Sequence, residues 1–176
     1  MTTQNNAVSL LRQQFKMGHE FLEGTLQGAD AQHAHWTPPG KAQPLGAQYA
    51  HVVLSEDGLI NGLLKGAAPL LASTWAEKVG VSELPPQAPP WNEWAGRVQV
   101  DLAALRSYAQ AVYENTDSYL ASLSDEDLNQ PLDLSAAGLG QQTFGSFLSI
   151  LVFNIHTHTG EIACLKGLQG LQGYPF

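Results

Sequence analysis

The chain has 176 residues, of which 44% are hydrophobic and 14% are charged, which predicts one globular domain over residues 1–176 and excludes a disordered protein. Its formal net charge of −8 makes phosphate backbones and anionic lipid poor partners, so we expect neither nucleic acid nor membrane binding. The single cysteine, Cys164, excludes an internal disulfide, and the N-terminus lacks the features of a signal peptide, so we expect a cytoplasmic protein.

Four segments carry apolar residues at helical spacing. They cover about residues 7–27, 44–65, 96–123 and 143–167. Long connections at 67–95 and 124–142 join the second segment to the third and the third to the fourth, and only the "PLDL" at 131–134 suggests a short extended piece. The pattern predicts an all-α protein, a four-helix bundle with long connections between helices 2 and 3 and between helices 3 and 4.

Polar residues in the first two helices are candidates for function. His19 falls on the apolar stripe of the first helix, where a packed core histidine is the main interpretation and a metal ligand is the alternative. His33 and His35 precede the second helix, and a surface loop is favoured there because no third ligand is near. His51 flanks the apolar face of the second helix beside small residues, whereas Glu56 projects onto that face and needs a partner if it is buried.

The most informative stretch is "FNIHTHTGEI" at 153–162, inside the most apolar helix. At about 100° per residue, His158 falls on the apolar stripe, His156 falls on roughly the opposite face, and Asn154 points almost the same way as His158. A buried imidazole needs partners for its ring nitrogens, so hydrogen bonding within the core and metal binding are both open here. Three tryptophans of the first long connection either line a pocket mouth or pack onto the bundle: Trp75, Trp91 and Trp94.

Two segments carry a resemblance to a known family: "PLGAQYAHVVLSEDGLINGLL" at 44–64 and "HTGEIACLKGLQGLQGYP" at 158–175. Together with the order of helices they resemble the DinB-like superfamily, also called DinB/YfiT-like metalloenzymes, whose H-x-G-[QE]-I motif matches "HTGEI". In that family a histidine of the second helix and an H-x3-H of the fourth bind one divalent metal, zinc or nickel. By position the resemblance implies His51 and His158 as ligands, with Asn154 in the place of the middle histidine.

An amide oxygen binds zinc or nickel more weakly than an imidazole does, so water or Glu161 is an alternative for the third position.

The resemblance implies a small-molecule substrate, a homodimer, and an S-transferase that uses a low-molecular-weight thiol such as bacillithiol or mycothiol on small electrophiles, with Glu56 or Glu161 moving the proton. The alternative is a non-catalytic bundle that binds a metal or small ligand at a degenerate site, which Asn154 favours. A third interpretation is that these polar groups only hydrogen-bond to one another in the core. We expect the rings of His51 and His158 to meet in one pocket.

Overall fold

The protein is mostly helical, as predicted. A computed structural model describes residues 6–86 and 91–176. None of the helices within these ranges combines the length and the apolar character that crossing a bilayer requires. The α-helices are α1 (Ala7–Thr25), α2 (Ala31–His35), α3 (Leu45–Asp57), α4 (Asn92–Ala95), α5 (Leu102–Ala121) and α6 (Phe144–Leu168), and the antiparallel strands are β1 (Pro131–Leu134) and β2 (Gly140–Thr143).

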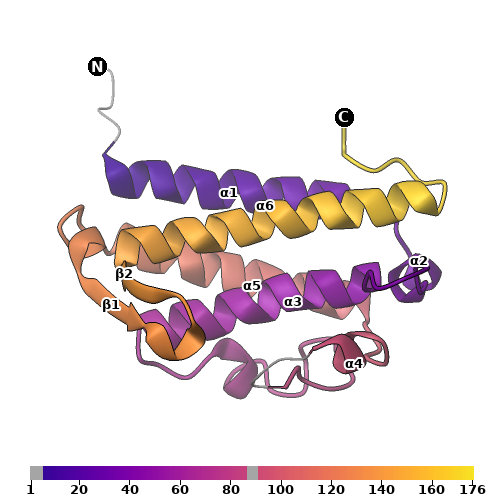
Figure 1. Cartoon of the computed structure of the whole chain (residues 1–176), viewed down its shortest axis with the longest axis horizontal. Coiled ribbons are helices and arrows are strands. Elements are labelled where there is room, and N and C mark those ends of the chain that lie inside the picture. The colour runs from indigo at the N-terminus through magenta and orange to yellow at the C-terminus, as the bar shows by residue number, and fades with distance from the viewer. Residues whose placement is uncertain (1–5, 87–90) are drawn as a thin grey trace.

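The long helices α1, α3, α5 and α6 lie side by side (Figure 1). Both α5 and α6 pack against α1 and against α3. The core between them contains a large aromatic side chain from each helix, none more than 2% exposed: Phe15, Tyr49, Tyr108 and Phe147. Large aromatic side chains contribute much of the apolar area that stabilises such a core. This packing brings α3 and α6, which are far apart in the sequence, into contact.

The beginning of α5 differs from the prediction. A helix was expected from residue 96, but Asp101 caps α5 by accepting hydrogen bonds from the backbone N–H groups of Ala103 and Ala104, so the helix begins at Leu102. The preceding residues form α4 and then a stretch that buries Val98 and Val100 in the core. The long connection therefore contributes to the core and is tied to the beginning of α5.

The second predicted helix, 44–65, is helical over almost its whole length but changes type within it. α3 ends at Asp57 and continues as a π-helix over Gly58–Leu64. The buried Asp57 carboxylate accepts hydrogen bonds from the backbone N–H groups of Leu70 and Leu71 and from the Tyr108 hydroxyl. Charge-assisted bonds to a buried carboxylate are among the strong ones, so the start of the long connection is fixed to α3 and α5.

The short elements α2, β1 and β2 lie where connections were expected. In α2, His35 Nε2 accepts a hydrogen bond from the backbone N–H of Val100, and His33 Nδ1 lies 2.6 Å from a carboxylate oxygen of Asp30. These local contacts account for both histidines structurally. The predicted extended piece at 131–134 is β1, which pairs with β2, and part of the connection at 67–95, residues 87–90, lies outside the described residues.

Candidate functional site

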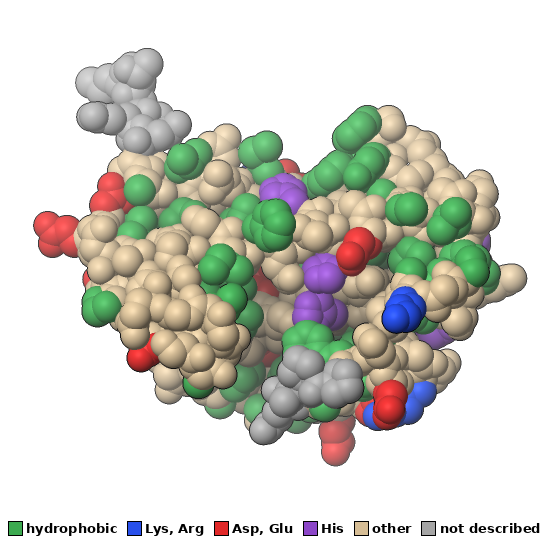
Figure 2. All heavy atoms as spheres, in the orientation of Figure 1, with side chains coloured by type: hydrophobic (Ala, Val, Ile, Leu, Met, Phe, Trp, Pro, Cys, Tyr) green, Lys and Arg blue, Asp and Glu red, His purple; other side chains and the backbone are tan. Residues whose placement is uncertain are grey.

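Two histidines from different helices meet on one face of the protein. His51 projects from α3 and His158 from α6, and both are half-buried. Their ring centroids are 4.9 Å apart and the ring planes are inclined at 74°. Figure 2 shows histidine side chains gathered near the middle of this face. The predicted meeting of the two rings is confirmed.

His158 is held by a carboxylate one turn further along α6. Its Nδ1 lies 2.6 Å from Oε2 of Glu161, and the two side chains are 19% and 46% exposed. Because an ionised carboxylate only accepts hydrogen bonds, this contact places the proton on Nδ1 and leaves the lone pair on Nε2. Metal-binding histidines are commonly oriented by a partner of this kind.

His51 has weaker local contacts. The hydroxyl of Ser55 lies 3.4 Å from its Nδ1, which is long for a hydrogen bond. Burial, reinforced by the neighbouring His158, lowers the pKa of His51 to about 4. The ring is therefore neutral at pH 7 and has a nitrogen lone pair available for a ligand.

The two rings open into a cavity of about 240 Å³ between α3, α6 and the connection before α5. Its lining consists of Gln43, Ala47, Gln48, His51, Trp91, Asn92, Trp94, Ala95, His158 and Glu161. Within this lining, which includes described residues only, Glu161 is the one carboxylate and there is no lysine or arginine. Amide side chains supply most of the remaining polar groups, so the cavity offers hydrogen-bond donors and acceptors to a small molecule.

Trp91 lines this cavity, and its indole N–H is buried. Its ring centroid lies 4.6 Å from that of His51, and its Nε1 is buried without a partner among the described residues. The neighbouring Trp94 differs, because its indole N–H donates to the backbone carbonyl of Glu83 at 3.0 Å. Buried polar groups normally have partners, so the indole N–H of Trp91 is an exception among the described residues.

The sequence profile of the DinB superfamily matches residues 14–162, a range that contains both histidines. The chain belongs to the DinB superfamily. It is also similar to a solved structure described as the crystal structure of the conserved protein of locus from Enterococcus faecalis, with a TM-score of 0.79, 24% sequence identity, and coverage of 94% of this chain and 98% of that chain. At this identity the likeness shows the fold alone. No curated protein matches the chain.

The other two residues implied by resemblance to the DinB superfamily, Asn154 and Glu56, do not line this cavity. Asn154 is half-buried on α6, one turn before His158, and is not part of the cavity lining. Glu56 is turned toward α1 and α5, where its carboxylate contacts His19 and Thr116. Of the residues expected to form the site, the structure therefore brings together His51, His158 and Glu161.

The spacing of the two rings fits a shared metal ion. Two imidazoles on one tetrahedral ion, with metal–nitrogen distances of about 2.0–2.1 Å, have ring centroids roughly 5 Å apart. The observed separation is 4.9 Å. Within residues 6–86 and 91–176, no group of three or more His, Cys, Asp or Glu side chains is arranged to hold a metal. The residues present in this DinB-superfamily chain fit a site with two imidazole ligands and open positions.

Sequence reasoning missed the amide side chains of the cavity and left the role of Trp91 open. Gln48 was detectable, because it precedes His51 by three residues on α3 and therefore lies on the same side of that helix. Gln43 and Asn92 were not detectable from spacing. Gln43 lies just before α3 and Asn92 begins α4, and the Gln43 amide donates a hydrogen bond to Asn92 Oδ1 at 3.1 Å. Only the three-dimensional path of the connection shows this contact.

The lowered pKa of His51 predicts how stability depends on pH. The folded state disfavours the protonated His51 ring. The contribution of the neutral ring to the free energy of unfolding is therefore complete above the ordinary pKa of 6.5 and is lost as the pH falls toward about 4. Between pH 7 and pH 4.5, metal-free wild type should lose about 2 kcal/mol more unfolding free energy than a His51→Gln variant. Urea unfolding at both pH values measures this difference, with the exposed His156→Gln variant as the control. Equal losses in wild type and His51→Gln would contradict the prediction.

Proposed function

We propose that this DinB-like four-helix bundle binds one divalent metal ion, zinc or nickel, through Nε2 of His51 and Nε2 of His158, and that it is a metal-dependent enzyme acting on a small molecule. The observation that carries the proposal is the meeting of two imidazoles from α3 and α6 at a centroid separation of 4.9 Å beside a cavity. Imidazole nitrogen suits both metals. An ion held by two side chains keeps positions for water or substrate, as a catalytic site requires.

The reaction that we propose is transfer to or from the sulfur of a low-molecular-weight thiol, with a small electrophile as the second substrate. A bound divalent ion supplies the means to lower the pKa of a thiol or a water molecule, so that a nucleophile exists at neutral pH. Glu161 fixes the His158 ring and is exposed enough to exchange a proton with solvent. The Trp91 ring, whose centroid lies 4.6 Å from that of His51, provides an apolar surface on which the substrate packs.

Asn154 supports a second candidate function, a non-catalytic module that binds a metal or a small ligand weakly. The residue occupies the position of a family histidine, and its side chain does not line the cavity. With two imidazoles in place of three, metal affinity is lower than in a three-histidine site. The two candidates share the metal site and differ in whether a thiol reacts there.

Metal analysis of protein without a histidine tag tests the shared site. After removal of metal with a chelator and dialysis against Zn²⁺ or Ni²⁺, we expect roughly one equivalent of bound ion, as a single site of this type would hold. A content far below one equivalent for both metals would overturn the proposal.

Conjugation of monochlorobimane, a slow model electrophile, to bacillithiol, mycothiol or glutathione then separates the candidates. Turnover that a chelator abolishes and the ion restores supports the enzyme, and stoichiometric metal without turnover supports the binding module.

A further inference from the structure

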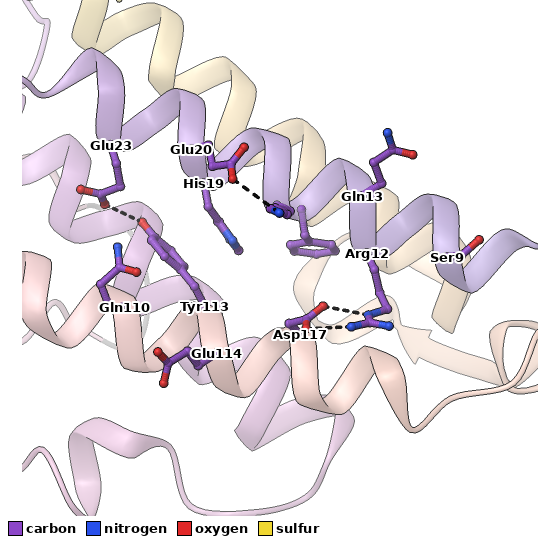
Figure 3. Close-up of a pocket in the computed structure, with 12 residues that line it drawn as sticks. Ser9, Arg12, Gln13, His19, Glu20, Glu23, Gln110, Tyr113, Glu114 and Asp117 are labelled. Carbon is purple, nitrogen blue, oxygen red and sulfur yellow. Dashed lines mark hydrogen bonds and ion pairs between the residues drawn. The ribbon is translucent and has the colours of Figure 1, made fainter. Parts of the chain in front are cut away.

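A second and larger hollow lies on the opposite edge of the helices, between α1 and α5. It has a volume of about 710 Å³ and shares no lining residue with the cavity of His51 and His158. Figure 3 shows side chains of both helices facing across it. We call it the α1–α5 groove, and it is lined by Ser9, Arg12, Gln13, Phe15, Lys16, His19, Glu20, Glu23, Gln110, Tyr113, Glu114 and Asp117.

The floor of the α1–α5 groove holds a buried imidazole–carboxylate pair. His19 Nε2 lies 2.8 Å from Oε2 of Glu56, and the side chains of the two residues are 9% and 3% exposed. The Thr116 hydroxyl donates to the other Glu56 oxygen at 2.7 Å. The carboxylate accepts from Nε2–H, and Nδ1 is the ring nitrogen that lies on the side away from this contact. No hydrogen bond joins Nδ1 to another described residue, and the ring lines the groove, so Nδ1 is available to a bound molecule.

Aromatic rings surround this acceptor. Tyr113 stacks on His19 with ring centroids 3.8 Å apart and planes inclined at 15°, and the Phe15 ring lies tilted to that of His19 with centroids 5.8 Å apart. The Tyr113 hydroxyl donates to Glu23 at 3.0 Å, as Figure 3 shows. Apolar stems of a ligand would pack on these rings, and aromatic faces also attract cations.

The charges of the α1–α5 groove favour a cation. Its lining contains two basic and four acidic side chains. Arg12 is already engaged, because its Nε and one terminal nitrogen each lie 2.8 Å from the Asp117 carboxylate. Lys16 lies 3.8 Å from Glu20. Glu23 lies 3.6 Å from Arg106, whereas exposed Glu114 of α5 has no such basic partner among the described residues, and the whole chain carries a net charge of −8.

We propose that the α1–α5 groove is a binding site for a small organic amine. The ammonium group donates one N–H to His19 Nδ1 and is attracted by the carboxylate of Glu114, while its hydrocarbon part packs on Tyr113 and Phe15. Glu56 is a positioning residue here, since it fixes the orientation of the His19 ring. The site is independent of the proposed metal site.

A titration with n-butylamine followed by ¹H–¹⁵N and imidazole NMR tests the proposal. We expect saturable shifts at His19 and Tyr113, little effect of n-butanol or butyrate at equal concentration, and the same binding in the His158→Ala variant. Glu114→Gln should weaken butylamine binding about three- to five-fold, as loss of one exposed ion pair does. Glu126→Gln removes the same charge from an exposed position outside the groove and should leave the affinity unchanged.

Three results would overturn the amine site. They are the absence of saturation at millimolar butylamine, tighter binding of butyrate than of butylamine, and equal weakening by Glu114→Gln and Glu126→Gln. Because Glu114 is exposed, its replacement tests the site without the risk of unfolding that accompanies replacement of buried His19. Failure of metal binding at His51 and His158 would leave the expected amine result unchanged.

Discussion

Replacing His158 with alanine is expected to weaken binding of Zn²⁺ or Ni²⁺ by at least about 100-fold. Loss of a partner that merely orients a ligand costs about 10–100-fold in metal affinity, and here one of two proposed ligands is removed. The His158 side chain is 19% exposed and lines the cavity, so its removal enlarges the cavity. His158 is not one of the buried core residues, so we expect the fold to remain intact. Competition with a metal-responsive dye, in protein without a histidine tag, measures the affinity directly.

His156→Ala is the matched control for that measurement. It removes the same side chain two residues away on α6, at an exposed position. Adventitious binding by surface histidines would fall equally in both variants, whereas a site at the two facing rings predicts that His156→Ala retains the wild-type affinity. Glu161→Gln should show an intermediate loss of about 10-fold, because a neutral amide orients the His158 ring less strongly than a carboxylate does. Equal affinities of wild type and His158→Ala would remove the metal proposal.

Replacing Glu56 with alanine is expected to lower the free energy of unfolding by about 3–5 kcal/mol, the usual cost of breaking a buried pair. Glu56 is 3% exposed and accepts hydrogen bonds from both His19 and Thr116. The variant leaves these two donors without an acceptor inside the core. Urea or guanidinium unfolding measures the change, and the same protein should still bind its equivalent of metal, since Glu56 faces away from His51.

A double-mutant cycle isolates the contact between His19 and Glu56. If the pair acts as a unit, the His19→Ala and Glu56→Ala variants and their combination should show a coupling free energy of about 1–3 kcal/mol. Ser118→Ala on α5, an exposed position two residues beyond Thr116, should change stability by less than about 0.5 kcal/mol. Additive effects of the two replacements would mean that the contact contributes nothing specific.

The long helices were predictable because each is a long segment rich in apolar residues, and their ends were less predictable. Asp101 decides where α5 begins, although the apolar pattern continues in front of it. The strand β2, "GQQT", contains no apolar alternation at all, and it forms because the chain returns alongside β1. Short elements of this kind depend on neighbours and not on their own sequence, so a periodicity argument does not reach them.

The candidate site, like the fold, could be predicted from the sequence only in part. Spacing indicated which residue of α6 faces inward, and the family resemblance indicated that His51 is its counterpart. Sequence analysis also noted that Glu56 needs a partner and that His19 lies on an apolar stripe, but only the structure shows that the two residues satisfy each other at 2.8 Å. Contacts between side chains of different helices depend on helix rotation and offset, which no single stretch of sequence contains.

The groups around His51 and His158 come from two kinds of structural element. The two imidazoles stand on long helices that a shared core holds in place, whereas Trp91 and Asn92 belong to the connection between α3 and α5. Loops accept insertions and exchanges far more readily than packed helices do. Changes at Trp91 or Asn92 would therefore alter the surroundings of the two rings while the helices keep the rings in place.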